Sequence, residues 1–568
     1  MKEIITIQVG DYANFIGSHF WNFQDELLAL ADDPNGDPVF KSQDLNMDVL
    51  YRTGETQQGI LTYTPRLVSI NLRGSLGSLS SSGTLYNEVA PTPSDVMTWT
   101  GKVSTQSSEP HKKNLFLQSL YEEEQKLNTA NEINNGSQRE YQDRELIESL
   151  ENSVQFWTDY SKVHYHPQSL YELSGAWMDV EKFDNYGSGR DAFSWASYGE
   201  EISDRLRFFV EECDHIQGIQ FIVDDSGGFS AVAADYMENI ADEYSNTPVL
   251  LYAVRGPDSH KSLKSKKRTI SGDLHDAISF SRLSSYCKLI VPVGLPFLNE
   301  SEASKFLHIK DEKPYHSSAV YAAALHSISL PFRMATVGPT TNASVSGAVD
   351  VNGVIQMLSG QARQNMVSIL DVTMPAPALS GGQNKQSFLE NLQSLTPQIS
   401  EDIEDVHAVE YMTVQGALGS EGHRASVSEV KDMIDAAFKH ADIRPMFCHL
   451  SAALCPLPIP LPFPSIFGDV VGQHGELMGT HITDSLSKGS LDVHSIPIAA
   501  RLRSNCAVLP LLESRLRNLH RFGIERGAPG AQLLRSWGFE KEELEEMEEM
   551  LSKMVAALSP PQLSSDSD

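Results

Sequence analysis

Short runs of apolar, mostly β-branched residues recur along the chain and alternate with segments whose apolar residues have helical spacing. The apolar runs are Ile4–Val9, Leu67–Leu72, Gly218–Val223, Val249–Val254 and Leu289–Val293. Helical spacing is found at Asn14–Ala31, Glu200–Glu212, Ala231–Tyr244, Ala277–Tyr286 and Ala319–Ile328. The run Gly218–Val223 has the composition of a strand buried on both faces of a sheet. The alternation predicts an α/β fold with parallel strands joined by helices.

Two of these strands lead directly into a glycine-bearing turn and then a helix. The first is Ile4–Val9, where Gly10–Gly17 can open a helix, and the second is Gly218–Val223, where Asp224–Ser230 forms the turn. In an open α/β sheet such a turn is the usual place for a nucleotide phosphate, because the N–H groups that begin the helix point at it. The pattern therefore raises the question of whether the chain binds a nucleotide.

The second half of the chain predicts a further domain and a helical C-terminal region. Ser346–Leu370 predicts a long helix, and Val427–His440 a shorter one. The stretch 456–464 is rich in proline and should be extended. Ile498–Arg526 is basic and predicted to be helical, whereas Glu540–Glu549 contains seven glutamates and predicts an acidic, amphipathic helix that continues through Met554.

Length and charge exclude some classes of function. The chain has 568 residues, more than one core accommodates, so two or three domains are expected. The net charge of −31 argues against nucleic-acid binding by phosphate neutralisation and suits a soluble acidic protein with basic partners. The five scattered cysteines fit a reducing compartment.

Membrane and export signals are not expected either. No stretch of about 18 uninterrupted apolar residues is present, so we expect no transmembrane segment, and any membrane contact would be peripheral. The first residues have neither the pattern of a secretory signal nor that of a mitochondrial presequence.

Other constellations are weaker candidates for chemistry. His164 and His166 lie two residues apart, as metal ligands can on a strand, but no further ligand is evident and a structural role is favoured. Cys448 and His449, with Cys455, do not complete a zinc site either. The basic run at 261–268 predicts a solvated loop, with nuclear import or binding to acidic lipid as the alternative. We predict no metal site and no catalytic triad.

The first 21 residues resemble the start of tubulins. The shared positions are Met1, Glu3, Ile4, Ile7, Gln8, Gly10, Asn14, Ile16, Gly17, Phe20 and Trp21, and a second match comprises Cys213, Asp214, Gln217, Gly218 and Gln220. The remainder departs from tubulin proper and resembles the Misato family over nearly the whole chain. That likeness is carried by Phe156–Asp159, His164–Ser169, Tyr315–Ser329 and Ser359–Ala378.

The resemblance implies a tubulin/FtsZ-like α/β fold. It has an N-terminal Rossmann-like parallel sheet flanked by helices, a second α+β domain and a C-terminal helical region. The expected parts are a tubulin-like N-terminal segment over 1–99, a polar insertion or linker over 100–145, the remainder of the nucleotide-fold domain over 146–345, the second domain over 346–495, the C-terminal helical region over 496–558 and a disordered tail over 559–568.

The family likeness also implies a function. Its members act in the distribution and morphology of mitochondria, so the chain is expected in the cytoplasm and on the cytosolic face of the outer mitochondrial membrane. Partners would be proteins, such as tubulin, chaperonin or outer-membrane proteins, and not nucleic acid. Links to microtubules and spindle formation are also implied by the family.

The nucleotide site of tubulins is altered in this chain. In tubulins Gly, Gln and Cys of the first turn face the nucleotide, whereas this chain has Gly10, Asp11 and Tyr12. A carboxylate repels phosphates, and a tyrosine is bulky where the backbone should approach closely. The second tubulin strand ends in acidic residues near magnesium, but here Asn71 and Arg73 stand in their place. Magnesium prefers carboxylate oxygens, so its site is weakened, although Arg73 could neutralise phosphate.

The turn after Gly218–Val223 is the third turn of the nucleotide site, counted after those that follow Ile4–Val9 and Leu67–Leu72. It departs furthest from the tubulin phosphate loop GGGTGSG, whose backbone N–H groups wrap the phosphates. The corresponding residues are Ser226, Gly227, Gly228, Phe229 and Ser230. Phe229 replaces the threonine, Val232 replaces the last glycine, and Asp224 and Asp225 add negative charge. The best counterpart of the tubulin polymerisation loop is Gly360–Asn365, where Arg363 leaves the acid missing.

Three hypotheses follow for the function. The substitutions favour a non-catalytic, tubulin-like protein, a pseudo-GTPase that organises mitochondria through partners, with GTP still a candidate ligand. The alternatives are a GTP-binding or GTP-hydrolysing protein that assembles like tubulin or FtsZ, and a tubulin-chaperone or scaffold component that affects microtubules. In the last case the acidic helix Glu540–Glu549 would contact basic surfaces.

Overall fold

The computed structural model describes most of the chain. The described residues are 2–41, 44–55, 61–80, 83, 111–129, 136–173, 183–194, 198–257, 270–335, 344–360, 365–379, 387–400, 405–419, 422–441, 444–478 and 487–559. The basic run at 261–268, residue 363 and the C-terminal tail from 560 lie outside them.

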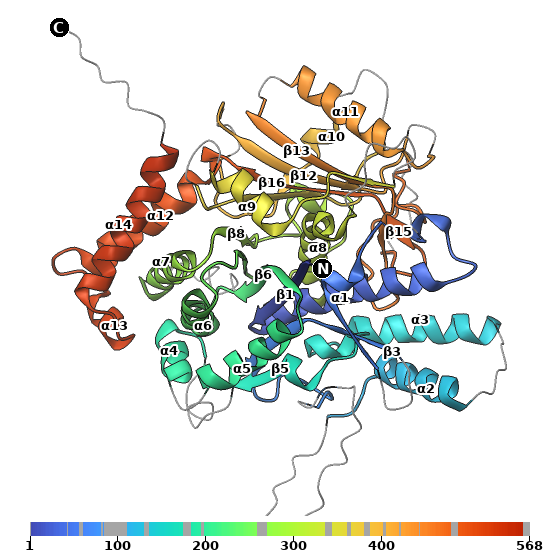
Figure 1. The fold of residues 1–568 in the computed structure, drawn as a ribbon, viewed down its shortest axis with the longest axis horizontal. Coiled ribbons are helices and arrows are strands. Elements are labelled where there is room, and N and C mark those ends of the chain that lie inside the picture. The colour runs from blue at the N-terminus through green and yellow to red at the C-terminus, as the bar shows by residue number, and fades with distance from the viewer. Residues whose placement is uncertain are drawn as a thin grey trace, which may run out of the picture.

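The N-terminal half forms a parallel six-stranded sheet in the order β5-β4-β1-β6-β7-β8. The strands are β1 Lys2–Val9, β4 Leu67–Leu72, β5 Leu170–Leu173, β6 His215–Asp224, β7 Val249–Val254 and β8 Leu289–Val293. Helices cover both faces (Figure 1). They are α1 Asp11–Asp32 and α8 Pro314–Ser329 on one face, and α4 Tyr186–Ser194, α5 Tyr198–Glu211, α6 Phe229–Glu243 and α7 Ile270–Ser285 on the other. The predicted parallel α/β sheet is confirmed.

Alternate residues of β1 divide the hydrophobic core between the two faces. Ile4 packs in the cluster that contains α1 and α8, whereas Ile5, Ile7 and Val9 pack in the cluster that contains α5, α6 and α7. On the α1 side Gln8 lies against Gly17, where a Cβ atom would meet the Gln8 amide at 2.1–2.3 Å. Glycine at this position therefore lets the first helix lie directly on the first strand.

Helix α8 lies between the N-terminal sheet and a second sheet, and all its residues from Tyr315 to Ser329 are buried. Its sequence is rich in Ala and Ser, so backbones can approach it closely from every side, as expected for a helix without a solvent face. Tyr411 donates a hydrogen bond to the Ile328 carbonyl at 3.0 Å, and Gln415 to the Ser327 hydroxyl at 2.7 Å. Both donors come from the second sheet, so α8 joins the two halves of the molecule.

The second sheet is mixed and has the order β11-β10-β16-β12-β13-β9. Its strands are β9 Val345–Ser346, β10 Ile369–Thr373, β11 Gln393–Ser394, β12 Val409–Gln415, β13 Phe447–Ala453 and β16 Ile498–Ser504. Helices α9 Val351–Gly360, α10 Ser387–Glu390 and α11 Val427–His440 accompany it. Two small antiparallel strand pairs lie outside the large sheets, β2 Tyr51–Glu55 with β3 Leu61–Pro65 and β14 Leu457–Pro458 with β15 Ser495–Ile496.

Two predicted helices are wrong in part. The long helix expected over Ser346–Leu370 ends at Gly360, and its last two residues begin strand β10. The segment Ile498–Arg526 begins as strand β16 and becomes helical only later. The basic residues that suggested a helix are held in the sheet by buried acids, since Asp371 pairs with both Arg501 and Arg503 at 2.7–2.8 Å. Long-range ion pairing thus overrides the local helical preference.

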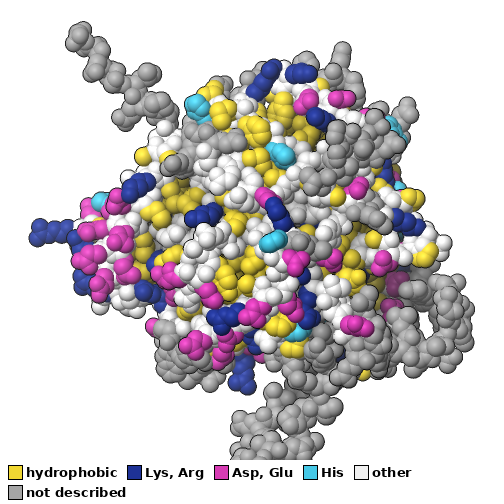
Figure 2. Space-filling model, in the orientation of Figure 1, with side chains coloured by type: hydrophobic (Ala, Val, Ile, Leu, Met, Phe, Trp, Pro, Cys, Tyr) yellow, Lys and Arg dark blue, Asp and Glu magenta, His cyan; other side chains and the backbone are white. Residues whose placement is uncertain are grey.

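The C-terminal helices pack on the outer side of α7. They are α12 Leu509–Leu519, α13 Ala531–Ser536 and α14 Lys541–Leu558. In α14 Leu544, Met547 and Leu551 are buried while most of its glutamates stay exposed, so the predicted amphipathic, acidic helix is confirmed. Figure 2 shows acidic side chains gathered over this edge of the molecule. None of the helices in the described ranges is long and apolar enough to cross a membrane.

Two helices lie in and beside the stretch predicted as a polar insertion, α2 Leu115–Thr129 and α3 Gly136–Ser153. The end of α3 is fixed by Glu151, whose carboxylate accepts hydrogen bonds from His316 Nε2 at 2.8 Å and from the Ser465 backbone N–H at 2.7 Å, and pairs with Lys313 at 3.3 Å. Burial alone would raise the pKa of Glu151, but these partners together lower it to about 2. One carboxylate therefore ties α3 to α8 and to the proline-rich segment. The predicted domain boundaries stay predictions.

Replacing Glu151 by Gln should lower the free energy of unfolding by about 1–3 kcal/mol at pH 7, because buried donors lose a charged acceptor. The folded-state pKa is depressed below the ordinary value of 4.5, so this stabilisation is fully present above that pH and is lost as the pH falls toward 2. Urea unfolding of the natural protein and of Glu151→Gln should show a difference in the free energy of unfolding that becomes smaller as the pH falls. The control Glu148→Gln, at an exposed position of the same helix, should change stability by less than about 0.5 kcal/mol.

Candidate functional site

The first turn of the sheet has the backbone geometry of a phosphate-binding site. Gly10 follows β1 with φ of 107°, and helix α1 starts at the next residue. Asn14 closes the turn by donating from its amide to the Gly10 carbonyl at 2.8 Å, while its own carbonyl accepts from Ser69 of β4 at 2.8 Å. Gly10 and Asn14, which are shared with tubulins, thus hold the shape of the turn.

Protein side chains occupy the space in front of Gly10. A Cβ atom at Gly10 would lie 2.5 Å from the Cβ atom of Asp224 and 3.1 Å from the ring of Phe229. Both residues belong to the third turn, at the end of β6 and the start of α6. The first and third turns therefore contact each other directly, where a phosphate group would have to lie between them.

Phe183, from the segment before α4, closes the third turn from the other side. Its carbonyl accepts a hydrogen bond from the Gly228 N–H at 3.2 Å and would lie 2.5 Å from a Cβ atom at Gly227, which has φ of 61°. Its ring covers Gly228 and meets the ring of Phe229 edge-on, with centroids 5.0 Å apart. The two surviving glycines thus make room for Phe183.

The serines of the third turn are bonded within the turn itself. The Ser226 hydroxyl donates to the Asp224 carboxylate at 2.6 Å, and its N–H donates to the same oxygen at 3.2 Å. The Ser230 hydroxyl donates to the Gly227 carbonyl at 3.0 Å, which also accepts from His275 Nε2 at 2.9 Å. These polar groups are therefore already satisfied without an anion.

The two acidic residues of this turn differ in their surroundings. Burial raises the pKa of Asp224 to about 6, against hydrogen bonds from Ser226 that lower it. Asp225 instead pairs with Arg255, whose Nε atom lies 2.7 Å from its carboxylate. At neutral pH Asp224 keeps a buried, mostly ionised carboxylate beside Gly10, and this charge opposes a phosphate there.

Tyr12 fills the space between the first turn and helix α8. It is buried, donates a hydrogen bond to Ser317 at 2.8 Å and meets the ring of Tyr321 edge-on. Its ring also covers Gly256, just after β7, where a Cβ atom would lie 3.0 Å away. The bulk predicted to obstruct the pocket therefore packs into the core, and Tyr12 reaches across the carboxyl ends of the strands.

Asp11 and Arg73 are exposed at the edge of the site, whereas Asn71 is buried. The Asn71 amide lies 3.4 Å from the Asp11 carboxylate and its carbonyl accepts from the Leu72 N–H at 2.8 Å. Arg73 is exposed, and its guanidinium forms no ion pair with the residues that the structure describes. Of the predicted site residues, this arginine alone offers a positive charge to an incoming phosphate.

The structure places all ten residues of the predicted pocket at one edge of the sheet. The predicted residues found there are Gly10, Asp11, Tyr12, Asn71, Arg73, Ser226, Gly227, Gly228, Phe229 and Ser230. Sequence reasoning missed Phe183 and His275, which pack on the third turn. Phe183 lies in a stretch of the sequence that is rich in aromatic residues, and no pattern there indicates a contact with the turn at 226–230.

The weaker metal candidates have structural surroundings. The His166 ring stacks on Phe208 with centroids 4.7 Å apart and accepts from the Gln168 N–H at 3.1 Å, and burial lowers its pKa to about 4. His449 lies 3.1 Å from the Gly347 carbonyl. Within the described ranges no three His, Cys, Asp or Glu side chains are grouped as metal ligands would be.

The tight contact at Gly10 yields a stability prediction. Gly10→Ala should lower the free energy of unfolding by about 2–4 kcal/mol, because the new Cβ atom meets Asp224 and the positive φ disfavours alanine. Gly74→Ala is the matched control: Gly74 has φ of 87° but nothing within 4 Å of its Cβ position, so only about 1 kcal/mol should be lost. Equal losses of unfolding free energy for Gly10→Ala and Gly74→Ala, measured in urea, would show that the first and third turns are not in tight contact.

Comparisons with known proteins agree with this architecture. Residues 2–122 match the family model described as Misato Segment II tubulin-like domain, and residues 147–334 match that of the Tubulin domain. Protein misato homolog 1 of Mus musculus is 29% identical over 591 aligned positions, which cover 98% of this chain and 97% of the relative.

Two further relatives extend the likeness. Protein misato homolog 1 of Macaca fascicularis is 32% identical over 417 positions, which cover 70% of this chain and 69% of the relative. Protein DML1 of Gibberella zeae is 28% identical over 385 positions, with 66% and 68% covered. Together with the tubulin-like sheet and its first turn, these matches establish that the chain belongs to the misato family of tubulin-like proteins.

Proposed function

We propose that this protein is a non-catalytic, tubulin-like member of the misato family that acts through protein partners in the distribution and morphology of mitochondria. It would act in the cytoplasm and on the cytosolic face of the outer mitochondrial membrane. The observation that carries the non-catalytic part is the filled third turn, where Phe183 and Phe229 lie against the glycines that should hold phosphates.

Loss of hydrolysis is supported by the hydrogen bonds of the third turn. A phosphate loop works through backbone N–H groups that point at the anion. Here the N–H of Gly228 is bonded to Phe183 and that of Ser226 to Asp224. A phosphate would have to displace Phe183 and also approach the ionised Asp224 carboxylate. Both steps oppose binding, and hydrolysis needs binding first.

The mitochondrial part of the proposal follows from the family to which the chain belongs. Its relatives carry the names misato homolog and DML1, and residues 2–122 match the family model described as Misato Segment II tubulin-like domain. Candidate partners are tubulin, chaperonin and proteins of the outer mitochondrial membrane. The exposed acidic face of α14 offers such partners a negatively charged surface (Figure 2).

The first experiment asks whether the purified protein uses GTP. We expect no guanine nucleotide to be released on denaturation, no phosphate release above the buffer rate, and no rise in melting temperature with millimolar GTP and magnesium. Mass spectrometry, a phosphate assay and thermal melting measure these three quantities.

Arg73→Glu provides the control, because this exposed rim residue can be inverted without disturbing the core. Gly227→Val would not serve, since its side chain would clash with Phe183 whether or not a nucleotide binds. A GTP-dependent melting shift in the natural protein that Arg73→Glu abolishes would contradict a non-binding site. Arg535→Glu, an exposed charge reversal on α13, should behave like the natural protein.

The second experiment tests the cellular role. Depletion of the protein should collapse or redistribute the mitochondrial network, and re-expression of either the natural protein or Arg73→Glu should restore it, because no phosphate is needed. Fluorescence imaging of mitochondria measures the outcome. Unchanged mitochondria after depletion would refute the mitochondrial role, whereas failure of a well-folded Arg73→Glu alone would refute nucleotide independence.

A further inference from the structure

A second cavity lies at the same edge of the N-terminal sheet, beyond the filled turns. Its volume is about 230 Å³. It is bounded by the carboxyl ends of β7 and β8, by α7, by α12 and by the loop that follows β11. The crevice outside the carboxyl ends of parallel strands is the usual place for a ligand in an α/β sheet. The N-terminal sheet with α7, the loop after β11 and helix α12 therefore meet around an open space, at the edge of the sheet where ligands usually bind.

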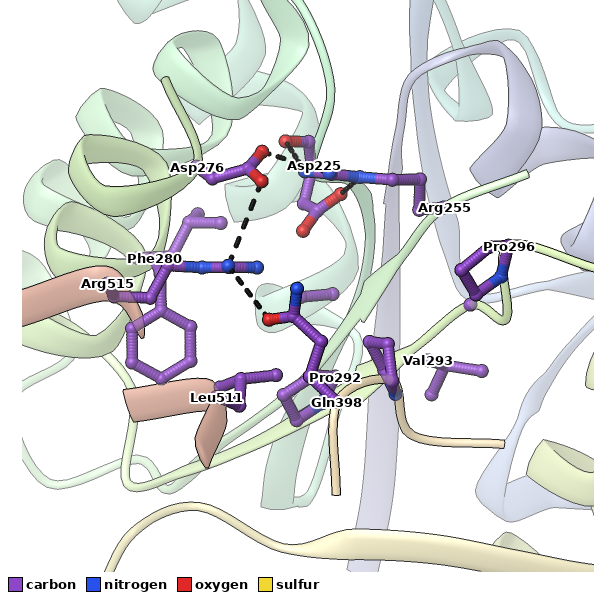
Figure 3. A pocket seen from close by; sticks show the side chains of 14 residues that line it. Asp225, Arg255, Asp276, Phe280, Pro292, Val293, Pro296, Gln398, Leu511 and Arg515 are labelled. Atoms are coloured by element: carbon purple, nitrogen blue, oxygen red, sulfur yellow. Dashed lines mark hydrogen bonds and ion pairs between the residues drawn. The ribbon is translucent and has the colours of Figure 1, made fainter. Parts of the chain in front are cut away.

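One wall of the cavity is a continuous chain of charged and polar side chains (Figure 3). Arg255 pairs with Asp225 at 2.7 Å and with Asp276 at 2.9 Å. Asp276 lies 3.8 Å from the guanidinium of Arg515, which in turn donates to the Gln398 side-chain carbonyl at 3.2 Å. Two carboxylates and two guanidinium groups balance, so the wall as a whole attracts neither anions nor cations strongly.

The other walls are apolar. They are formed by Ala253, Phe280, Leu283, Pro292, Val293 and Leu511. An apolar space with a few convergent polar groups is typical of small-molecule sites, and this one is smaller than the about 300–1,000 Å³ of pockets for drug-sized ligands. A nucleotide is excluded by this size.

The polar end of the cavity contains a strained residue. Gln398 has φ of 57° and is the only non-glycine residue with positive φ in the part of the chain that the structure describes. Such strain is concentrated at binding and switching sites, where a ligand can relieve it. Arg515 as a residue is 6% exposed, and its guanidinium donates a hydrogen bond to the side-chain carbonyl of Gln398. This side chain thus occupies the position that an incoming acceptor would take.

We propose that this cavity binds a small, largely apolar molecule that carries one carbonyl or carboxylate group. The acceptor group replaces the Gln398 carbonyl on Arg515, and the apolar body packs against Phe280 and Leu511. Occupation ties α7, α12 and the loop after β11 together, so binding stabilises the junction of the N-terminal sheet, the second sheet and the C-terminal helices. The site lies beside the filled nucleotide turns and shares Asp225 with the third turn, but the proposed ligand contacts Arg515, Phe280 and Leu511, which lie outside those turns.

Ligand-observed NMR and thermal melting of the full chain test the site with three probes of one size. Benzamide carries a neutral acceptor, benzoate a charged one, and benzylamine no acceptor. We expect at least one of the first two to bind with a millimolar or lower dissociation constant and to raise the melting temperature, and benzylamine to bind at least tenfold more weakly. A preference for benzamide over benzoate would assign a neutral ligand, and the reverse an acid.

Two variants locate the binding. Ala253→Phe fills the apolar part and should weaken binding of the preferred probe at least tenfold, while Gln398→Ala removes the competing carbonyl and should tighten it at least threefold. Gln398→Gly should tighten binding equally and, by relieving the backbone, melt at a higher temperature than Gln398→Ala. No binding of benzamide or benzoate, equal binding of benzylamine, or affinities that Gln398→Ala and a folded Ala253→Phe leave unchanged would each overturn the proposal.

Discussion

The close packing of helix α8 is the constraint on which the rest of the structure depends. This helix has no exposed face, and its small side chains allow both sheets to approach it. The same hydrophobic cluster therefore contains α1, α8 and the inner face of the second sheet. Tyr12 joins the first turn to this packing through its hydrogen bond to Ser317. A side chain that obstructs the nucleotide position is thus also part of what holds the two halves together.

Under the proposed function, the filled turns would let a tubulin-like scaffold be stable without a nucleotide. An empty phosphate loop would leave N–H groups and glycines facing a void, which is unfavourable in a protein interior. Phe183 and Phe229 fill that space, and internal bonds satisfy Ser226 and Ser230. The same substitutions therefore have two effects. They oppose phosphate binding, and their side chains fill the space by packing.

Local sequence pattern predicted much of the fold and about half of what shapes the site. Strands β7 and β8 and helix α11 lie where the apolar pattern placed them, because each buries a face defined by neighbouring residues. Strand β16 was missed because Asp371, more than a hundred residues earlier, pairs with its arginines. The identity of the turn residues was readable, but the contact of Phe183 with Gly228 was not, since no local pattern encodes a contact between distant segments.

The filled nucleotide turns and the second cavity both lie at the carboxyl edge of the N-terminal sheet, but they differ in how their buried charges are balanced. In the nucleotide turns, aromatic rings fill the volume, and the buried Asp224 carboxylate forms no ion pair with the residues that the structure describes. At the second cavity, Arg255 and Arg515 together balance the charges of Asp225 and Asp276, so the same edge can remain open without an unpaired charge. Adjacent residues 224 and 225 thus face two environments. The third turn, which in the proposed function holds no phosphate, supplies through Asp225 one end of the polar wall of the second cavity.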